Sequence, residues 1–280
     1  MITSPHNNQQ LFSDHYLNTI LPERHDWQAL TVEAQPVLEA LEAIFKRYKP
    51  SEKEKEAQTE DDFVKPVLKT LGHTFAVQAS LAAPNRSQTP DYVFYHDQYA
   101  LEVNKGKILT EALLESKAFA VGDAKSWNRP LDIAMKAEGK DRDLLTNKNP
   151  SYQIAFYILH SGLEWGVLTN GRLWRLYHKS TAHRLDHYYE VDLPALLAST
   201  KSTKEKAEEF LYFYAFFRRD AFEQHPLSVA TILKESIDYA QGISEQLKKQ
   251  VYEALRYIAQ GFLDYPTNHL SPDTPETLKS

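Results

Sequence analysis

The sequence predicts a mixed α/β fold, in which helices flank a mixed β-sheet and an α-helical region follows towards the C-terminus. Short apolar runs typical of strands lie near residues 74–78, 91–95 and 118–125. A helical pattern over residues 152–160 separates these runs from a hairpin pattern over residues 166–177. Helix, strands, helix and hairpin in this order indicate an α/β core.

The N-terminal part of the chain has helical patterns. Apolar residues recur with helical spacing over residues 34–45, and a second helical pattern runs from Glu56 towards Leu71. Glu56 and Glu60 lie one turn apart on the same face of that second helix. We therefore expect residues 1–50 to form a helical extension and residues 51–195 to form the core domain.

The hairpin and the C-terminal region have clear local signals. Asn170-Gly171 between two apolar runs predicts a type I′ turn. Ser202 followed by Glu205 is a capping-box pattern, which predicts that a helix begins there. Its aromatic residues cover every side of the helix, which favours burial over stacking on unpaired bases. Residues 196–280 are predicted to form a helical connector region.

The composition excludes several classes of protein. The chain has 280 residues and no cysteine, so a disulfide framework, a thiolate zinc site and a cysteine nucleophile are excluded. No run approaches the length of a membrane span, and the first residues lack a signal-peptide pattern. We therefore expect a cytoplasmic protein that does not enter a membrane.

The net charge of −6 argues against a protein that is basic over its whole surface. Nucleic-acid binding would then depend on a local basic stripe. Residues 166–187 carry four Lys and Arg residues against the single acid Asp186, and the candidates for phosphate contact are Arg172, Arg175 and Lys179, with Arg129 earlier in the chain. A solvated hairpin face explains the same charges equally well.

The pattern with the most chemical content is Pro90-Asp91 followed by Asp123-Ala124-Lys125. Asp123 and Lys125 point to the same face of a strand, because side chains alternate along it. Two carboxylates and a lysine brought together can hold a hard divalent cation and position a water molecule. Other acid-x-Lys triplets, Glu115-Ser116-Lys117 and Glu138-Gly139-Lys140, lie in helical or loop-like stretches. A site built from Glu102-Val103-Asn104-Lys105 would need a different geometry.

These motifs occur in an order that resembles a known family. The set consists of Glu56-Ala57-Gln58-Thr59, Pro90-Asp91, Asp123-Ala124-Lys125, Gln153-x-x-x-Tyr157 and the hairpin over residues 165–177. It resembles the N-terminal nuclease domain of type IIG restriction–modification enzymes, and it is similar to the nuclease domain of type I restriction subunits. Both belong to the PD-(D/E)xK nucleases. The resemblance covers residues 50–190 and implies a restriction-endonuclease-like mixed sheet flanked by helices.

The resemblance also implies roles for individual residues. Asp91, Asp123 and Glu56 would hold Mg²⁺, with Glu60 as the rival of Glu56. Lys125 would orient the attacking water, or help to deprotonate it, and would stabilise negative charge. Gln153 and Tyr157 match a glutamine and a tyrosine that face the same site. The substrate would be double-stranded DNA, cut by hydrolysis of a phosphodiester bond.

In type IIG enzymes the same chain continues into an adenine methyltransferase, but no glycine-rich S-adenosylmethionine loop occurs here. The methyltransferase and the specificity region are therefore expected in a longer chain or in a separate subunit, and double-strand cleavage implies pairing on DNA. Asn149-Pro150-Ser151-Tyr152 is reminiscent of a methyltransferase motif but is interpreted as a helix start. His183 and His187 have zinc-ligand spacing without a third ligand. The alternative function is a non-cleaving DNA-binding or assembly module that retains the nuclease fold.

Overall fold

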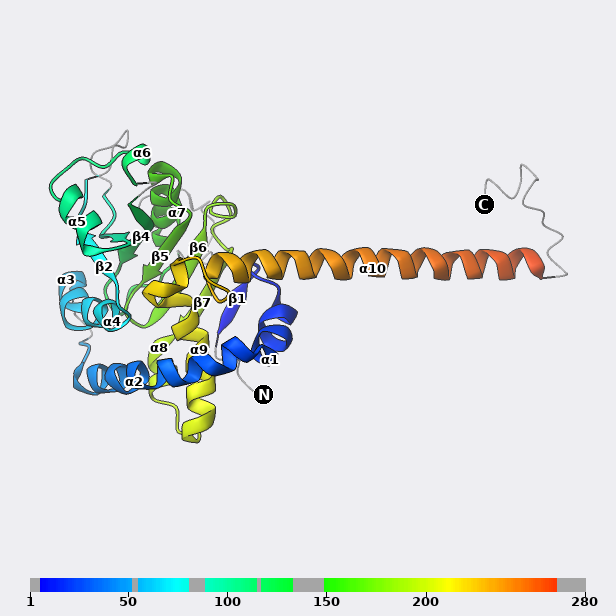
Figure 1. Ribbon diagram of the computed structural model, residues 1–280, viewed down its shortest axis with the longest axis horizontal. Helices are drawn as coiled ribbons and strands as arrows, with labels where there is room; N and C mark the ends of the chain where they lie inside the picture. The colour runs from blue at the N-terminus through cyan, green and yellow to red at the C-terminus, as the bar shows by residue number, and fades with distance from the viewer. Residues whose placement is uncertain (1–5, 52–54, 81–88, 115–116, 133–148, 266–280) are drawn as a thin grey trace, which may run out of the picture. The chain divides into compact units, whose positions relative to one another are not determined.

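The computed structural model describes residues 6–51, 55–80, 89–114, 117–132 and 149–265. The chain divides into two compact units, Met1–Lys234 and Glu235–Ser280. The first unit contains a seven-stranded mixed sheet with flanking helices, which confirms the predicted α/β class (Figure 1). The predicted domain boundaries at residues 50 and 195 do not coincide with this division. An N-terminal strand pairs with the last strand of the sheet, and the helices on both sides of the core belong to the same unit.

The sheet has the strand order β1-β7-β6-β5-β4-β3-β2. The strands are β1 (Asn7–Gln9), β2 (Thr74–Val77), β3 (Tyr92–Tyr95), β4 (Ala118–Ala124), β5 (Trp165–Thr169), β6 (Leu173–His178) and β7 (Tyr188–Asp192). Among the seven described strands, β4 and β5 are parallel to each other, and the other neighbouring pairs are antiparallel. The C-terminal ends of β4 and β5 therefore lie at the edge of the sheet where β3 and β6 begin.

Helical segments precede, interrupt and follow the strands. They are η1 (Tyr16–Ile20), α1 (Leu21–Glu23), α2 (His25–Arg47), α3 (Glu56–Thr59), η2 (Glu60–Val64), α4 (Lys65–Thr70), α5 (Gln98–Asn104), α6 (Glu111–Leu114), α7 (Pro150–Ser161), α8 (Leu193–Leu197), α9 (Thr203–Phe217), η3 (Arg219–Phe222) and α10 (Val229–Asp264). None of the helices in the described ranges combines the length and the apolar character that a membrane span requires.

Helix α7 packs on one face of the sheet, against β4 and β5 (Figure 1). A glycine in β5 permits this close approach, because a Cβ atom added to Gly166 would lie 2.6 Å from Ile158 Cδ1. Ile158 is fully buried together with Val121 of β4 and Leu168 of β5. Alternation along β4 places Asp123 on the same face as Val121, and therefore on the side of the sheet that α7 covers.

Helix α9 contributes its aromatic side chains to the opposite face. Trp174 of β6 makes edge-to-face contacts with Phe213 and Phe217, and Tyr189 of β7 stacks on Phe216. Phe213, Phe216 and Phe217 are at most 1% exposed, so burial is the role of this aromatic set. The helix begins at the predicted capping box, in which Ser202 and Glu205 bond to each other's backbone N–H groups.

The prediction of a type I′ turn at Asn170-Gly171 is wrong. That turn requires a positive φ at both residues, but of the two only Gly171 has one, at 82°. The backbone N–H of Asn170 instead donates to the carbonyl of Leu173. The side-chain oxygen of Asn170 accepts the N–H groups of Arg172 and Leu173 at 3.1 and 2.8 Å, and this local bonding shifts the turn by one residue.

Candidate functional site

The two motif aspartates meet at one edge of the sheet. Asp91 directly precedes β3, and Asp123 is the penultimate residue of β4, which is antiparallel to β3. Since Tyr92 is opposite Gly122, the next step of the register brings Asp91 opposite Asp123. The carboxylate of Asp91 accepts a hydrogen bond from the backbone N–H of Ala124 at 2.8 Å. The two motifs, which were expected to come together, are therefore neighbours in the sheet.

Lys125 and Asp123 form a buried ion pair. The Nζ atom of Lys125 lies 2.6 Å from Oδ2 of Asp123, and the Asp123 side chain is only 2% exposed. The backbone N–H of Lys125 donates to the carbonyl of Thr169 at 2.8 Å, so the lysine is also fixed to the end of β5. The pKa of Asp123 is raised to about 8, chiefly by burial, with Lys125 opposing the shift and Asp91 adding to it. Burial acts to lower the pKa of Lys125, but the neighbouring carboxylates raise it above its ordinary value.

A cluster of three carboxylates lies beside this pair. Glu56, Glu60 and Asp91 each offer an oxygen, and the three oxygens lie within 4.8 Å of one another. Burial raises the pKa of Glu56 and of Glu60, and the neighbouring Asp91 adds to both shifts. Carboxylate oxygens are the ligands that Mg²⁺ prefers, so this donor set fits a hard divalent cation.

A tyrosine holds one member of the cluster in position. The hydroxyl of Tyr92 donates to Oε2 of Glu60 at 2.6 Å, and Tyr92 is 1% exposed. Lys65 lies 3.9 Å from the same oxygen. Glu60 therefore has a fixed position in the cluster, as a partner of Glu56 rather than as an alternative to it. The role of Tyr92 could not be predicted from local patterns, because its partner lies 32 residues away in the chain.

Tyr157 faces the same carboxylates from α7. Burial raises the pKa of its hydroxyl, and the negative charges of Asp123, Asp91 and Glu56 raise it further. Gln153 is partly exposed one turn earlier on the same helix. The predicted helix start at residues 149–152 is confirmed, since the side chain of Asn149 caps α7 by accepting the N–H of Ser151.

Of the four predicted DNA contacts, Arg129 and Arg172 lie at the edge of the sheet that carries the site. The positive charge of Arg129 acts to lower the pKa of Glu56, and its carbonyl accepts a hydrogen bond from the side chain of Asn170 at 2.9 Å. Arg172 is an exposed residue of the β5–β6 turn, where its Nε donates to Asp192. Both arginines are exposed to solvent.

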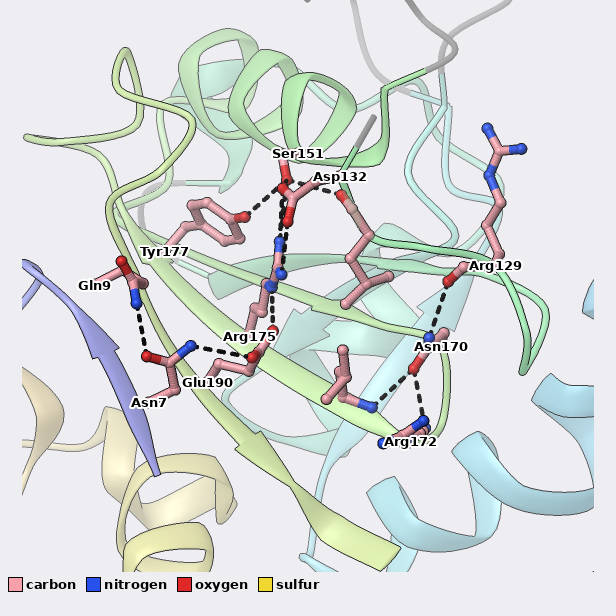
Figure 2. Close-up of polar contacts among 12 residues, drawn as sticks. Asn7, Gln9, Arg129, Asp132, Ser151, Asn170, Arg172, Arg175, Tyr177 and Glu190 are labelled. Atoms are coloured by element: carbon pink, nitrogen blue, oxygen red, sulfur yellow. Dashed lines mark hydrogen bonds and ion pairs between the residues drawn. The ribbon is translucent and has the colours of Figure 1, made fainter. Parts of the chain in front are cut away.

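Arg175 and Lys179 are placed differently. Arg175 is only 4% exposed, and its guanidinium donates to both oxygens of Asp132 and to Glu190 (Figure 2). A buried guanidinium paired in this way has no free face for a phosphate, so the DNA-contact role predicted for Arg175 is not supported. Lys179 follows β6 at the opposite end of the strands and donates to the carbonyl of Gly162 at 3.0 Å. Charge along the sequence could not distinguish these positions, because it does not show which side of a strand is covered.

The hydrogen-bonded cluster of Arg175, Asp132, Glu190, Ser151 and Tyr177, here called the Arg175 cluster, was not predicted from the sequence. Ser151 at the start of α7 donates to Asp132 and to the carbonyl of Leu131, and its hydroxyl is 3.1 Å from that of Tyr177 (Figure 2). The cluster ties the segment after β4 and the beginning of α7 to the sheet. Through these bonds Arg175 supports the two segments that flank the carboxylates.

The remaining motifs give no second site within the described ranges. The triplets at residues 115–117 and 138–140 lie wholly or partly outside those ranges. Glu102 and Asn104 belong to α5, and no metal-type cluster among the described residues includes His183 or His187. Comparison with family models, with curated proteins and with solved structures gives no match for this chain. The site is therefore interpreted from its own geometry, and the resemblance to PD-(D/E)xK nucleases stays a prediction.

Proposed function

We propose that this chain is a Mg²⁺-dependent DNA endonuclease of the PD-(D/E)xK type. The observation that carries the proposal is the convergence of Asp91, Asp123 and Lys125 at one edge of the sheet, next to Glu56 and Glu60. Four carboxylates with one lysine among them are unfavourable unless positive charge is supplied. Several carboxylates with one lysine suit a site that binds a divalent cation together with a phosphate.

Asp91, Glu56 and Glu60 would hold the cation, and Asp123 lies next to them. Bound Mg²⁺ would supply Lewis-acid chemistry, namely polarisation of a phosphate oxygen and a lower pKa for a coordinated water. Lys125 would present its ammonium group to the attacking water and to the negative charge that develops on the phosphate. Tyr157 and Gln153 would line the same space from α7, and Arg129 would orient the DNA backbone through a phosphate.

The substrate in this proposal is double-stranded DNA, and the context is a restriction–modification system in the cytoplasm. An adenine methyltransferase and a specificity region would be supplied by a longer chain or by a separate subunit. Arg172 at the site edge is the second candidate for a phosphate contact. Phosphate contacts of this kind position the duplex but do not read its sequence.

The test is nicking of supercoiled plasmid DNA in Mg²⁺ and in EDTA. We expect Mg²⁺-dependent cleavage by the unaltered chain, and a loss of at least about 100-fold in Asp123→Ala and Lys125→Ala, because each removes charge at the reacting centre. Asp186→Ala is the matched control. Its carboxylate is 84% exposed and lies before β7, away from the carboxylate cluster.

Duplex binding should be measured in parallel by fluorescence anisotropy in Ca²⁺. Equal cleavage by the unaltered chain and the three variants would contradict the catalytic roles of Asp123 and Lys125. Binding without cleavage by any of them would favour the alternative of a DNA-binding or assembly module. If the unaltered chain neither binds nor cleaves DNA, that result would contradict both functions for the chain on its own.

A further inference from the structure

A basic run of the sequence lies at the end of helix α2. Residues 46–55 contain five cations and two acids, a net charge of 5 − 2 = +3 in a chain whose net charge is −6. An acidic protein that binds DNA needs local positive charge of this kind. Arg175 and Lys179, two of the cations expected to contact DNA, are bonded within the protein instead. Further cations near the candidate site are therefore of interest.

Three cations of this run line one groove, here called the α2 groove. Arg47, Lys49 and Lys55 border a cavity of about 810 Å³ between the end of α2 and the segment from α3 to α4, and α2 packs beside α4 (Figure 1). All three residues are exposed. One acid, Asp62, also lines the groove and accepts a hydrogen bond from the side chain of Gln58. The α2 groove is therefore predominantly positive.

The described part of the protein does not neutralise these three charges. Among the residues that the structure describes, no ion pair involves Arg47, Lys49 or Lys55. Arg47 donates through Nε to the carbonyl of Ala43, and cations in the last turn of a helix also offset the negative end of its dipole. That role explains Arg47, but it does not explain Lys49 and Lys55, which follow α2.

The α2 groove adjoins the candidate site through one helical segment. Lys55 directly precedes Glu56, the first residue of α3. Gln58 and Asp62 line the groove, whereas Glu56 and Glu60 belong to the carboxylate cluster. The segment formed by α3 and η2 therefore carries groove residues and cluster residues within two turns of each other.

A hydrogen bond also links the α2 groove to the loop that carries Arg129. The side chain of Asn128 donates to the carbonyl of Ser51, another lining residue of the groove, at 3.4 Å. Phosphates along one strand of a duplex follow each other about every 3.4 Å of its axis. A duplex with one phosphate at the carboxylate cluster therefore presents further phosphates to nearby cations.

We propose that the α2 groove holds the phosphate backbone of the duplex to one side of the cleaved bond, with Arg47, Lys49 and Lys55 as the contacts. This inference rests on the proposed function, because it takes the carboxylate cluster as the place of cleavage. Contacts to phosphates position a duplex but do not read its sequence, so the groove acts equally on all sequences. Helix α2 is then part of the DNA-binding surface.

The first test is the salt dependence of duplex binding. Fluorescence anisotropy in Ca²⁺ measures the affinity for two duplexes of unrelated sequence at several KCl concentrations, without any cleavage step. In Arg47→Gln/Lys49→Gln/Lys55→Gln we expect binding of both duplexes to weaken at least about 10-fold. The slope of log K against log[salt] should fall by up to about 2.7, because each neutralised phosphate contributes about 0.9.

A matched control removes the same residue types elsewhere. Lys248→Gln/Lys249→Gln/Arg256→Gln changes three exposed positions of α10 and should bind like the unaltered chain. Circular dichroism and urea unfolding check that both triple variants are folded. An unchanged salt slope in the groove variant, an equal loss in the control, or no duplex binding by the unaltered chain would overturn the proposal.

Plasmid cleavage separates the α2 groove from the reacting centre. At saturating DNA the groove variant should cleave at the rate of the unaltered chain, because it keeps every residue proposed for the chemistry. A rate as low as that of Lys125→Ala would contradict a role in binding alone. If no protein cleaves but the salt slope falls in the groove variant, the phosphate contacts stand and only the nuclease proposal fails.

The absence of cysteine allows the contact to be located. Lys55→Cys and Lys249→Cys each contain a single thiol, whose rate of alkylation by iodoacetamide is measured with and without duplex. We expect the duplex to slow alkylation at residue 55 and not at residue 249. Equal rates at residue 55 would overturn the proposal. Displacement of the duplex by micromolar ATP, if lost in the groove variant, would assign the groove to a nucleotide instead.

Discussion

The carboxylate of Asp91 accepts a hydrogen bond from the backbone N–H of Ala124, with an oxygen–nitrogen distance of 2.8 Å. The bond connects the start of β3 to the end of β4, where Ala124 lies between Asp123 and Lys125. One oxygen of Asp91 is thus bonded to the backbone, while an oxygen of the same carboxylate also belongs to the cluster with Glu56 and Glu60. Asp91 therefore holds the two motifs in register and supplies charge to the site.

Replacing Asp91 should separate these two roles. Asp91→Asn keeps an oxygen that can accept the Ala124 N–H, so we expect the free energy of unfolding to change by less than about 1 kcal/mol. Cleavage should fall at least about 100-fold, because the negative charge is lost. Asp91→Ala should lose about 1 kcal/mol more of stability than Asp91→Asn. Urea unfolding and plasmid cleavage measure the two effects. Wild-type cleavage by Asp91→Asn would remove this residue from the site.

The Tyr92 hydroxyl should tune metal binding through Glu60. In Tyr92→Phe the carboxylate loses the donor that orients it, and loss of such an outer partner typically weakens metal affinity 10- to 100-fold. Mn²⁺ titration by calorimetry measures this affinity without any catalytic step. Tyr95→Phe is the matched control, because it removes a hydroxyl from another buried tyrosine of β3 that lies outside the cluster. Equal affinities for the two variants would show that Glu60 needs no orienting bond.

The buried Arg175 should matter for stability. Arg175→Met leaves Glu190, which is 9% exposed, without its counter-charge. Breaking a buried pair in this way costs about 3–5 kcal/mol, which urea unfolding at pH 7 can measure. Arg172→Met removes the exposed ion pair with Asp192 and should cost about 1 kcal/mol or less. If the two variants lose the same stability, the Arg175 cluster does not hold the segment after β4 to the sheet.

His73 should make the protein less stable in mild acid. Its Nε2 lies 2.7 Å from the carbonyl oxygen of Phe217, and its Nδ1 is buried without a partner among the described residues. Burial lowers the pKa of His73 to about 4 from the ordinary 6.5; the charge of Arg219 lowers it further, while the Phe217 carbonyl and Asp220 oppose the shift. The unfolded chain therefore binds a proton near pH 6.5 and the folded chain only near pH 4. The contribution of His73 to the free energy of unfolding therefore does not change above pH 6.5, and it falls by up to about 3 kcal/mol as the pH drops to 4.

The measurement is urea unfolding at pH 7.0, 6.0, 5.0 and 4.5. His73→Gln keeps a donor for the Phe217 carbonyl and removes the titration, so its stability should depend less steeply on pH. His6, whose pKa is also lowered to about 4 by burial, retains its share of the dependence. An unchanged slope in His73→Gln would show that His73 does not cause the acid sensitivity.

The sequence was sufficient to predict the strands that carry the site and the grouping of its central residues. Short apolar runs located β3 and β4, and period-two alternation placed Asp123 and Lys125 on one face, where the structure has them. Helical spacing likewise grouped Glu56 with Glu60. These predictions succeeded because each depends only on local geometry, which residue type and spacing determine over a few residues.

Contacts between distant segments required the tertiary structure. The bond from Tyr92 to Glu60 and the burial of Arg175 between Asp132 and Glu190 both join residues far apart in the chain. A basic residue on a strand looks the same in the sequence whether its side of the sheet is covered or open. Local patterns therefore determined which residues could form a site, and only the packing of the sheet and its helices decided which charges are buried, which are paired and which remain available to a ligand.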